Sequence, residues 1–107
     1  MLTLIRDAQV YAPSPMGKID VLIAGGQIAA MDTNLPRIPA GIEHTEVKAD
    51  GQLLIPGLID GHIHCSGGGG EAGPETRVPR IHLSHITEAG VTSCVGVLGT
   101  DGTTRTV

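Results

Sequence analysis

Two histidines separated by one residue, His62 and His64, carry the strongest chemical signal in this sequence. They end an apolar segment, residues 58–64, that we expect to form a buried β-strand. Because side chains alternate along a strand, both imidazoles would point to the same side. Neutral imidazole is a good ligand for zinc and similar ions, so the pair is a candidate half of a metal site. Two inert, hydrogen-bonded histidines at a strand end are the alternative, and the spacing alone does not decide between them.

A glycine-rich segment, Gly67-Gly-Gly-Gly-Glu-Ala-Gly-Pro74, follows the histidines at once. Glycines let the backbone approach a ligand closely and present its N–H groups. The segment has neither the Walker pattern nor the dinucleotide-binding glycine pattern. Within it, Glu71 is a candidate to bind a substrate ammonium group, with an exposed loop charge as the alternative. Asp60, two residues before His62, is either a carboxylate that orients the site or an aspartate that caps a turn.

A second predicted strand, residues 91–98, is followed by an exit loop that contains Thr100 and Asp101. If the two strands run parallel, these residues lie at the same edge as His64 and belong to the candidate site. An ordinary turn is the alternative. Structural or surface roles are expected for the remaining histidines and the two cysteines: His44, Cys65, His82, His85 and Cys94.

Composition excludes several classes of function. The 107 residues carry a net charge of −4, and no basic stripe suited to nucleic acid is present. No apolar run approaches the roughly 20 residues of a membrane helix, and the N-terminus has no secretory signal. Two cysteines without Cys-x-x-Cys spacing fit a reducing cytoplasm.

The pattern of the chain changes near Pro56. Residues 1–55 read as short strands joined by turns, including a hairpin at Gly25-Gly26, and predict a small antiparallel β-sandwich segment. Residues 56–107 read as strand, loop, helix (within 76–89, ended by Gly90) and parallel strand, which is one βαβ unit. Two parallel strands cannot cover their own faces. We therefore expect the N-terminal part of a larger protein, truncated, and for a closed (β/α)8 barrel roughly 200 further residues.

The segment Pro56-Gly-Leu-Ile-Asp-Gly-His-Ile-His64 resembles the first metal-binding strand of the amidohydrolase superfamily. Members of that superfamily have a short N-terminal β-sandwich segment that leads into a (β/α)8 barrel of the TIM type. The glycine-rich segment, together with Thr87-Glu-Ala-Gly-Val-Thr-Ser93 and Leu98-Gly-Thr-Asp101, closely resembles the isoaspartyl dipeptidases. The resemblance covers residues 52–105 closely and the rest of the chain loosely.

This resemblance implies a cytoplasmic binuclear zinc hydrolase that cleaves β-aspartyl dipeptides and forms large homo-oligomers. By position, His62 and His64 match ligands of one zinc ion, the backbone at Gly69 and the Glu71 side chain match groups that bind the substrate's α-amino end, and Thr100 matches a substrate contact. The family's remaining ligands and its catalytic aspartate have no counterpart here, so we expect the isolated chain to be inactive. A dihydroorotase-like or hydantoinase-like enzyme of the same superfamily, and a non-catalytic fragment, are the alternatives.

Overall fold

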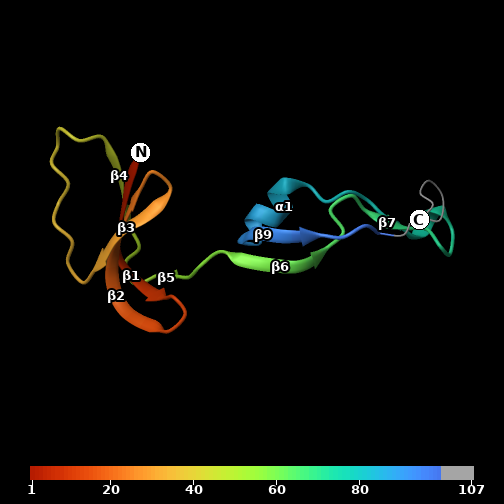
Figure 1. Ribbon diagram of the computed structural model, residues 1–107, viewed down its shortest axis with the longest axis horizontal. Coiled ribbons are helices and arrows are strands. Elements are labelled where there is room, and N and C mark those ends of the chain that lie inside the picture. The colour runs from red at the N-terminus through yellow and green to blue at the C-terminus, as the bar shows by residue number, and fades with distance from the viewer. Residues whose placement is uncertain (100–107) are drawn as a thin grey trace. The chain divides into compact units, whose positions relative to one another are not determined.

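The computed structural model describes residues 1–99 of the chain, and these fold as two compact units. The first unit comprises Met1–Pro56, and the second begins at Gly57 (Figure 1). Among the described residues, no helix has the length and apolar character needed to cross a membrane.

The first unit is one mixed, five-stranded sheet in the order β3-β2-β1-β4, with β5 also paired to β1. Antiparallel pairing joins β1 to β2 and β2 to β3, whereas β4 and β5 both run parallel to β1. The prediction that all pairing in this unit is antiparallel is therefore wrong for β4 and β5. The long segment 33–43 carries the chain from β3, at one edge, back to the free edge of β1, and such a crossover produces parallel pairing. The strands are β1 (Leu2–Tyr11), β2 (Pro15–Ala24), β3 (Gln27–Asp32), β4 (His44–Lys48) and β5 (Leu53–Leu54).

The predicted hairpin at Gly25-Gly26 is confirmed. Ala24 pairs with Gln27 across the turn, which leaves the two glycines as its central residues. Their φ angles of 59° and 80° are the positive values that a type I′ turn requires at both central positions. Glycine adopts them without steric cost, which explains why this dipeptide predicts the turn correctly.

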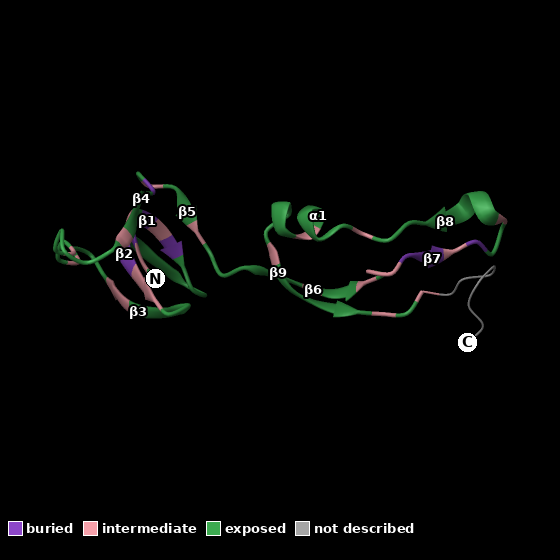
Figure 2. Ribbon diagram, turned by 90° about the horizontal axis from the view of Figure 1, so that it is seen from above, coloured by how far each residue is buried: buried purple, intermediate pink, exposed green. Residues whose placement is uncertain are grey.

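The buried apolar side chains of the described residues all belong to the first unit. Alternate residues of β1 and β2 face this core, as strand geometry requires. Partly buried side chains from β3 and β5 pack against it. The fully or nearly buried apolar residues are Leu4, Ala8, Val10, Ile19, Val21 and Ala49. The buried residues near β7 in the second unit (Figure 2) are glycines.

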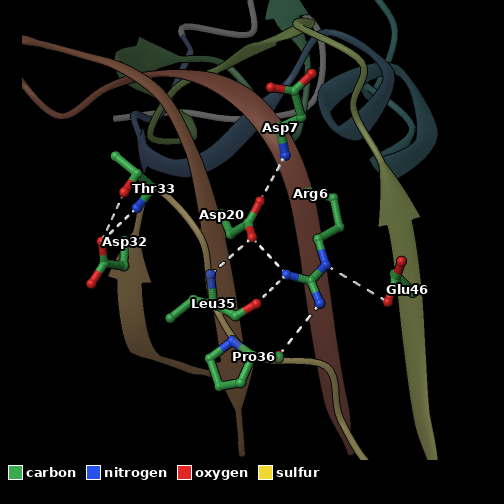
Figure 3. Close-up of polar contacts among 8 residues, drawn as sticks. All are labelled: Arg6, Asp7, Asp20, Asp32, Thr33, Leu35, Pro36 and Glu46. Carbon is green, nitrogen blue, oxygen red and sulfur yellow. Dashed lines mark hydrogen bonds and ion pairs between the residues drawn. The ribbon is translucent and has the colours of Figure 1, made fainter.

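A charged network joins the sheet to the long segment after β3 (Figure 3). One guanidinium nitrogen of Arg6 lies 2.6 Å from Asp20 Oδ2 and also donates to the Leu35 carbonyl oxygen. Asp20 accepts further hydrogen bonds from the backbone N–H groups of Asp7, at 2.9 Å, and Leu35, at 3.1 Å. The Arg6 and Asp20 side chains are only 17% and 9% exposed. Asp20 thus holds together two strands and the crossover segment.

The second unit contains two parallel strands, β6 (Leu58–Ile63) and β9 (Val91–Gly96), joined through helix α1 (Leu83–Glu88). This confirms the predicted order of strand, helix and parallel strand. Between β6 and α1 the chain also forms a short 3-10 turn, η1 (Pro74–Thr76), and a two-stranded antiparallel ribbon of β7 (Gly68–Gly69) and β8 (Arg77–Val78).

Within the predicted helical region 76–89, Val78 precedes Pro79, so the regular helix is expected to begin at or after Pro79. Helix α1 begins at Leu83, and Arg77 and Val78 pair with the glycine-rich segment. Its end is as predicted. Gly90 has φ 77°, and its N–H donates to the Thr87 carbonyl oxygen. A glycine with positive φ immediately after the last turn is a common helix terminator.

The prediction that β6 and β9 are buried is wrong for this chain. Ile59 is 75% exposed, Val95 is 55% exposed and Leu58 is 48% exposed (Figure 2). A sheet of two strands with one short helix against it has too little structure to cover its faces. The apolar composition of β6 and β9 is typical of buried parallel strands, but in this chain their side chains are exposed to solvent.

We expect Asp20→Asn to lower the free energy of unfolding of the chain by about 3 kcal/mol, because the enclosed Arg6 guanidinium loses its closer carboxylate partner. Its other carboxylate partner, Glu46, lies farther away, with Oε2 3.7 Å from Arg6 Nε. The matched control is Asp7→Asn, which removes an ion pair to Lys18 at 3.8 Å in which both side chains are more than half exposed. That change should cost less than about 1 kcal/mol. Urea unfolding followed by circular dichroism compares the two, and equal losses would contradict the role given to Asp20.

Stability should also fall in acid through the same carboxyl group. Burial alone would raise the pKa of Asp20, but hydrogen bonds from the Asp7 and Leu35 N–H groups and the Arg6 guanidinium outweigh it and lower the pKa below its ordinary 3.8. The stabilisation is therefore complete above the unfolded-state pKa of about 3.9 and is lost as the pH falls through the folded-state value. In urea titrations between about pH 2 and pH 6, Asp20→Asn should weaken the dependence of the unfolding free energy on pH. The same dependence in the variant and in the unaltered chain would contradict this role of Asp20.

Candidate functional site

The imidazoles of His62 and His64 lie together at the end of β6. Their ring centroids are 5.1 Å apart, and the ring planes meet at 74°, in an edge-to-face arrangement. Both side chains are exposed. The structure thus brings the two predicted ligand residues close to each other, at the edge of the sheet where the parallel strands end.

An irregularity in β6 sets the position of His62. Asp60 pairs with Cys94 and Ile63 pairs with Gly96, so three steps along β6 match two steps along β9. The extra residue interrupts the ladder, as in a β-bulge, which changes the direction of nearby side chains. The His62 N–H donates to Asp60 Oδ1 at 3.0 Å in place of a ladder partner. Asp60 therefore caps the backbone locally, which is the simpler of its two predicted roles.

The glycine-rich segment folds beside His64. The Gly67 N–H donates to the His64 carbonyl oxygen at 3.0 Å, which turns the chain sharply after the strand. A cavity of about 260 Å³ is bounded by His64 and by the ribbon that the segment forms with residues 77–78. Its lining residues are His64, Gly68, Gly69, Val78 and Gly99. Two residues predicted for the site, His64 and Gly69, therefore share one cavity.

Glu71 lies next to this cavity. A β-carbon built at Gly69 would be 3.8 Å from Glu71 Oε2, so the carboxylate and the Gly69 backbone are neighbours. Gly69 has φ 88°, a conformation that favours glycine. The remaining predicted site residues, Thr100 and Asp101, lie outside the described residues.

Gly99 is a site residue that sequence reasoning missed. A β-carbon at this position would lie 2.8 Å from the Gly67 carbonyl oxygen and 3.1 Å from His64 Nδ1. Only a residue without a side chain allows the chain after β9 to pass this close to the imidazole. Its sequence signal is weak, because a glycine after an apolar strand is equally typical of an ordinary turn.

The described residues do not form a complete metal site. Zinc sites in proteins use three or four protein ligands. Among residues 1–99, no cluster of three or more histidine, cysteine, aspartate or glutamate side chains is placed to hold a metal ion. The exposed, adjacent imidazoles of His62 and His64 fit a metal as a two-ligand contribution, and further ligands would have to come from elsewhere.

The other histidines have contacts of their own. His44, in the first unit, is within 2.8 Å of the Ile42 carbonyl oxygen through Nδ1, as expected for a structural residue. His82 and His85 face each other at the start of α1, with ring centroids 5.6 Å apart. Cys94 is exposed rather than in a core, because the face of β9 that carries it is not covered.

We expect Gly99→Ala to disturb the site selectively, because the added methyl group would overlap the space of the Gly67 carbonyl oxygen and the His64 ring. Overpacking of this kind costs about 1–3 kcal/mol. The matched control is Gly61→Ala, since a β-carbon at Gly61 meets no atom within 4 Å. Imidazole NMR signals of His64 should move in the first variant and stay in the second. Unchanged signals in both would contradict the packing described.

Comparison with proteins of known structure identifies close relatives. The β-aspartyl dipeptidase of Fervidobacterium islandicum AW-1 is 42% identical over the whole of this chain, with TM-scores of 0.87 and, in complex with a β-Asp-Leu dipeptide, 0.88. The chain spans 28–29% of the length of those proteins. The L-hydantoinase of Arthrobacter aurescens, 16% identical with a TM-score of 0.66 over 89% of this chain and 20% of its own, shares the fold.

Curated relatives match between about half and nearly all of the chain. An adenine deaminase of Latilactobacillus sakei is 36% identical over 103 residues, which are 94% of this chain and 16% of that protein. An adenine deaminase of Deinococcus radiodurans is 48% identical over 63 residues, which are 57% of this chain and 11% of that protein. A dihydroorotase of Streptomyces coelicolor is 45% identical over 62 residues, 58% of this chain and 13% of that protein. No protein-family model matches the chain. The strand-rich mixed architecture matches the N-terminal domain of amidohydrolases, and the relatives of this chain are hydrolases of the amidohydrolase superfamily.

Proposed function

We propose that this chain is the N-terminal part of a binuclear zinc dipeptidase that hydrolyses β-aspartyl (isoaspartyl) dipeptides. The observation that carries the proposal is the 42% identity to a β-aspartyl dipeptidase over the whole chain, at a TM-score of 0.87–0.88. That match includes the histidine pair and the glycine-rich segment around the cavity. The adenine deaminase of Deinococcus radiodurans and the dihydroorotase of Streptomyces coelicolor cover only 57% and 58% of the chain. The adenine deaminase of Latilactobacillus sakei covers 94% of the chain, but at a lower identity of 36%.

Each candidate residue has a defined part in this proposal. His62 and His64 would hold one zinc ion through their ring nitrogens. Bound zinc polarises a scissile carbonyl and lowers the pKa of a bound water molecule. Gly69 and Glu71, which are neighbours at the cavity, would bind the substrate's α-amino group, since a carboxylate forms strong charge-assisted hydrogen bonds with an ammonium group. Thr100 would contact the substrate from the chain after β9.

The proposal extends to the fold and the assembly. Residues 1–55 would belong to an N-terminal β-sandwich segment, and β6, α1 and β9 would begin a (β/α)8 barrel. The exposed apolar side chains of Leu58, Ile59 and Val95 support this, because the strands of such a barrel are covered on both faces. We propose a homo-oligomer in the cytoplasm, where the free thiols of Cys65 and Cys94 fit the reducing conditions.

Hydrolysis of a cyclic amide by a dihydroorotase-like enzyme is the second candidate. Six dihydroorotases match the chain at 36–45% identity, which favours this second candidate, although each match covers at most 67% of the chain. A non-catalytic fragment is the third candidate, and it is favoured because no group of three or more possible metal ligands occurs among the described residues.

The experiment that separates the candidates is a chimera. Residues 1–107 replace the matching segment of the Fervidobacterium islandicum enzyme, and hydrolysis of β-Asp-Leu, dihydroorotate and hydantoin is measured with zinc present. We expect turnover of β-Asp-Leu, and its loss in His62→Ala and His64→Ala together with loss of bound zinc. The 107-residue chain alone should bind less than one zinc ion and turn over none of the substrates.

The same chimera tests Glu71 against a matched control in the same loop. Glu71→Gln should lower kcat/KM for β-Asp-Leu by about ten- to a hundredfold, through loss of a charge-assisted hydrogen bond of about 1.5–3 kcal/mol. Glu75→Gln, an exposed glutamate of η1, should leave it unchanged. A chimera that folds and binds zinc but hydrolyses only the cyclic amides would replace the dipeptidase assignment by the second candidate, and one that binds no zinc would favour the third.

A further inference from the structure

The two cysteines of the chain are brought together at the end of the parallel sheet, and the proposed hydrolase activity does not use them. Cys94 lies on β9, opposite Asp60 in the register, and is exposed. Cys65 follows β6 by two residues, in the turn that leads into the glycine-rich segment, and is half-buried. Both are free thiols.

Gly96 shows where the Cys65 sulfur lies. A β-carbon built at Gly96 would be 3.9 Å from Cys65 Sγ. Because side chains alternate along a strand, Cys94 and Gly96 project from the same face of β9. The Cys65 sulfur therefore lies over the face of β9 that carries Cys94, in space that is open because residue 96 has no side chain.

The Cys65 thiol also acts on the pKa of Cys94. Local desolvation, the neighbouring Cys65 thiol and the Asp60 carboxylate together raise the pKa of the Cys94 thiol. An effect of Cys65 on Cys94 requires the two side chains to be in close range, which agrees with the placement given by Gly96.

We propose that Cys65 and Cys94 are a site of reversible oxidation, at which a hydroperoxide converts the two thiols to an intramolecular disulfide that ties the turn after β6 to β9. The inference does not depend on the proposed dipeptidase function. It is consistent with a reducing cytoplasm, where disulfides are transient and redox-responsive rather than structural.

The chemistry balances with hydrogen peroxide as the oxidant. The sulfur of one cysteine, as thiolate, attacks a peroxide oxygen, the O–O bond breaks, and a sulfenic acid and one water form. The sulfur of the second cysteine then displaces the sulfenic oxygen as a second water and forms the S–S bond. Two thiols and one peroxide thus give one disulfide and two waters. A thiol such as dithiothreitol reverses the change by exchange.

Oxidation would act on the candidate site because Cys65 adjoins His64 in the sequence. The Cys65 carbonyl oxygen accepts a hydrogen bond from the Ile81 N–H at 3.2 Å, which already fixes one side of this turn. A disulfide to β9 would fix the other side. The backbone beside His64 would then be fixed on one side by Ile81, in the segment that leads into α1, and on the other side by β9. It would have less freedom to adjust to a ligand.

The test treats the reduced 107-residue chain, at low protein concentration, with hydrogen peroxide and maps the products by mass spectrometry without reduction. Trypsin cleavage at Arg77 and Arg80 separates the cysteines. We expect peptides 49–77 and 81–105 to be joined, with the loss of two hydrogens and complete reversal by dithiothreitol. Cys65→Ser and Cys94→Ser should each abolish the link.

A matched control moves the thiol to the opposite face of β9. In the double variant Ser93→Cys, Cys94→Ser, the thiol is one residue earlier in the strand and points away from Cys65. This variant should form the intramolecular disulfide at least about tenfold more slowly than the unaltered chain, because the two thiols are no longer close together. Equal rates in this variant would overturn the proposal. Disulfide-linked dimers as the main product, or sulfinic acid at Cys94 with Cys65 still reduced, would overturn it as well.

Discussion

Parallel pairing of β6 with β9 is the constraint on which the candidate site depends. Parallel strands end at the same edge of their sheet, so chain segments that are far apart in sequence leave the two strands side by side. The Val97 N–H donates to the Ile63 carbonyl oxygen at 2.9 Å, which extends the register past the last strand residues. It is this register that brings Gly99 against the His64 ring. If β6 and β9 were antiparallel, Gly99 and His64 would lie at opposite edges of the sheet.

The connection between these strands builds the other half of the cavity. The glycine-rich segment turns back at Gly67 and pairs through β7 with β8, so that the crossover passes the end of β6 before it reaches α1. Backbone packing is tight here. A β-carbon at Gly69 would lie 2.9 Å from the Thr76 carbonyl oxygen, and one at Gly70 would lie 2.9 Å from the Arg77 side chain. The run of glycines is therefore a requirement of packing as well as a means of exposing backbone to a ligand. These two explanations do not compete, because a close backbone approach serves both.

Local signals in the sequence were sufficient for the features that depend on neighbouring residues. The Gly25-Gly26 hairpin, the end of α1 at Gly90 and the order of strand, helix and parallel strand all follow from turn chemistry and periodicity. The features that were predicted incorrectly depend on residues that are distant in the sequence. Parallel pairing of β4 with β1 depends on how the segment 33–43 crosses the sheet, which composition does not encode. Likewise, β7 consists of two glycines, and without side chains there is no alternation to indicate a strand. Gly99 was missed because it too has no side chain to give a signal. Its role is to leave space for the Gly67 carbonyl oxygen and the His64 ring.

Stability is distributed unevenly between the two units, and this bears on how the histidine pair can work. The buried apolar side chains of the described residues, and the Arg6–Asp20 network, belong to the first unit. The second unit is held mainly by strand pairing and backbone hydrogen bonds, which are features of regions that open at low free-energy cost. A ligand that binds both imidazoles only when β6 is formed would stabilise that unit by mass action. Ligand affinity and local folding are therefore coupled at this site. When a ligand binds only to His62 and His64, part of the binding free energy is used to order β6, which carries these residues.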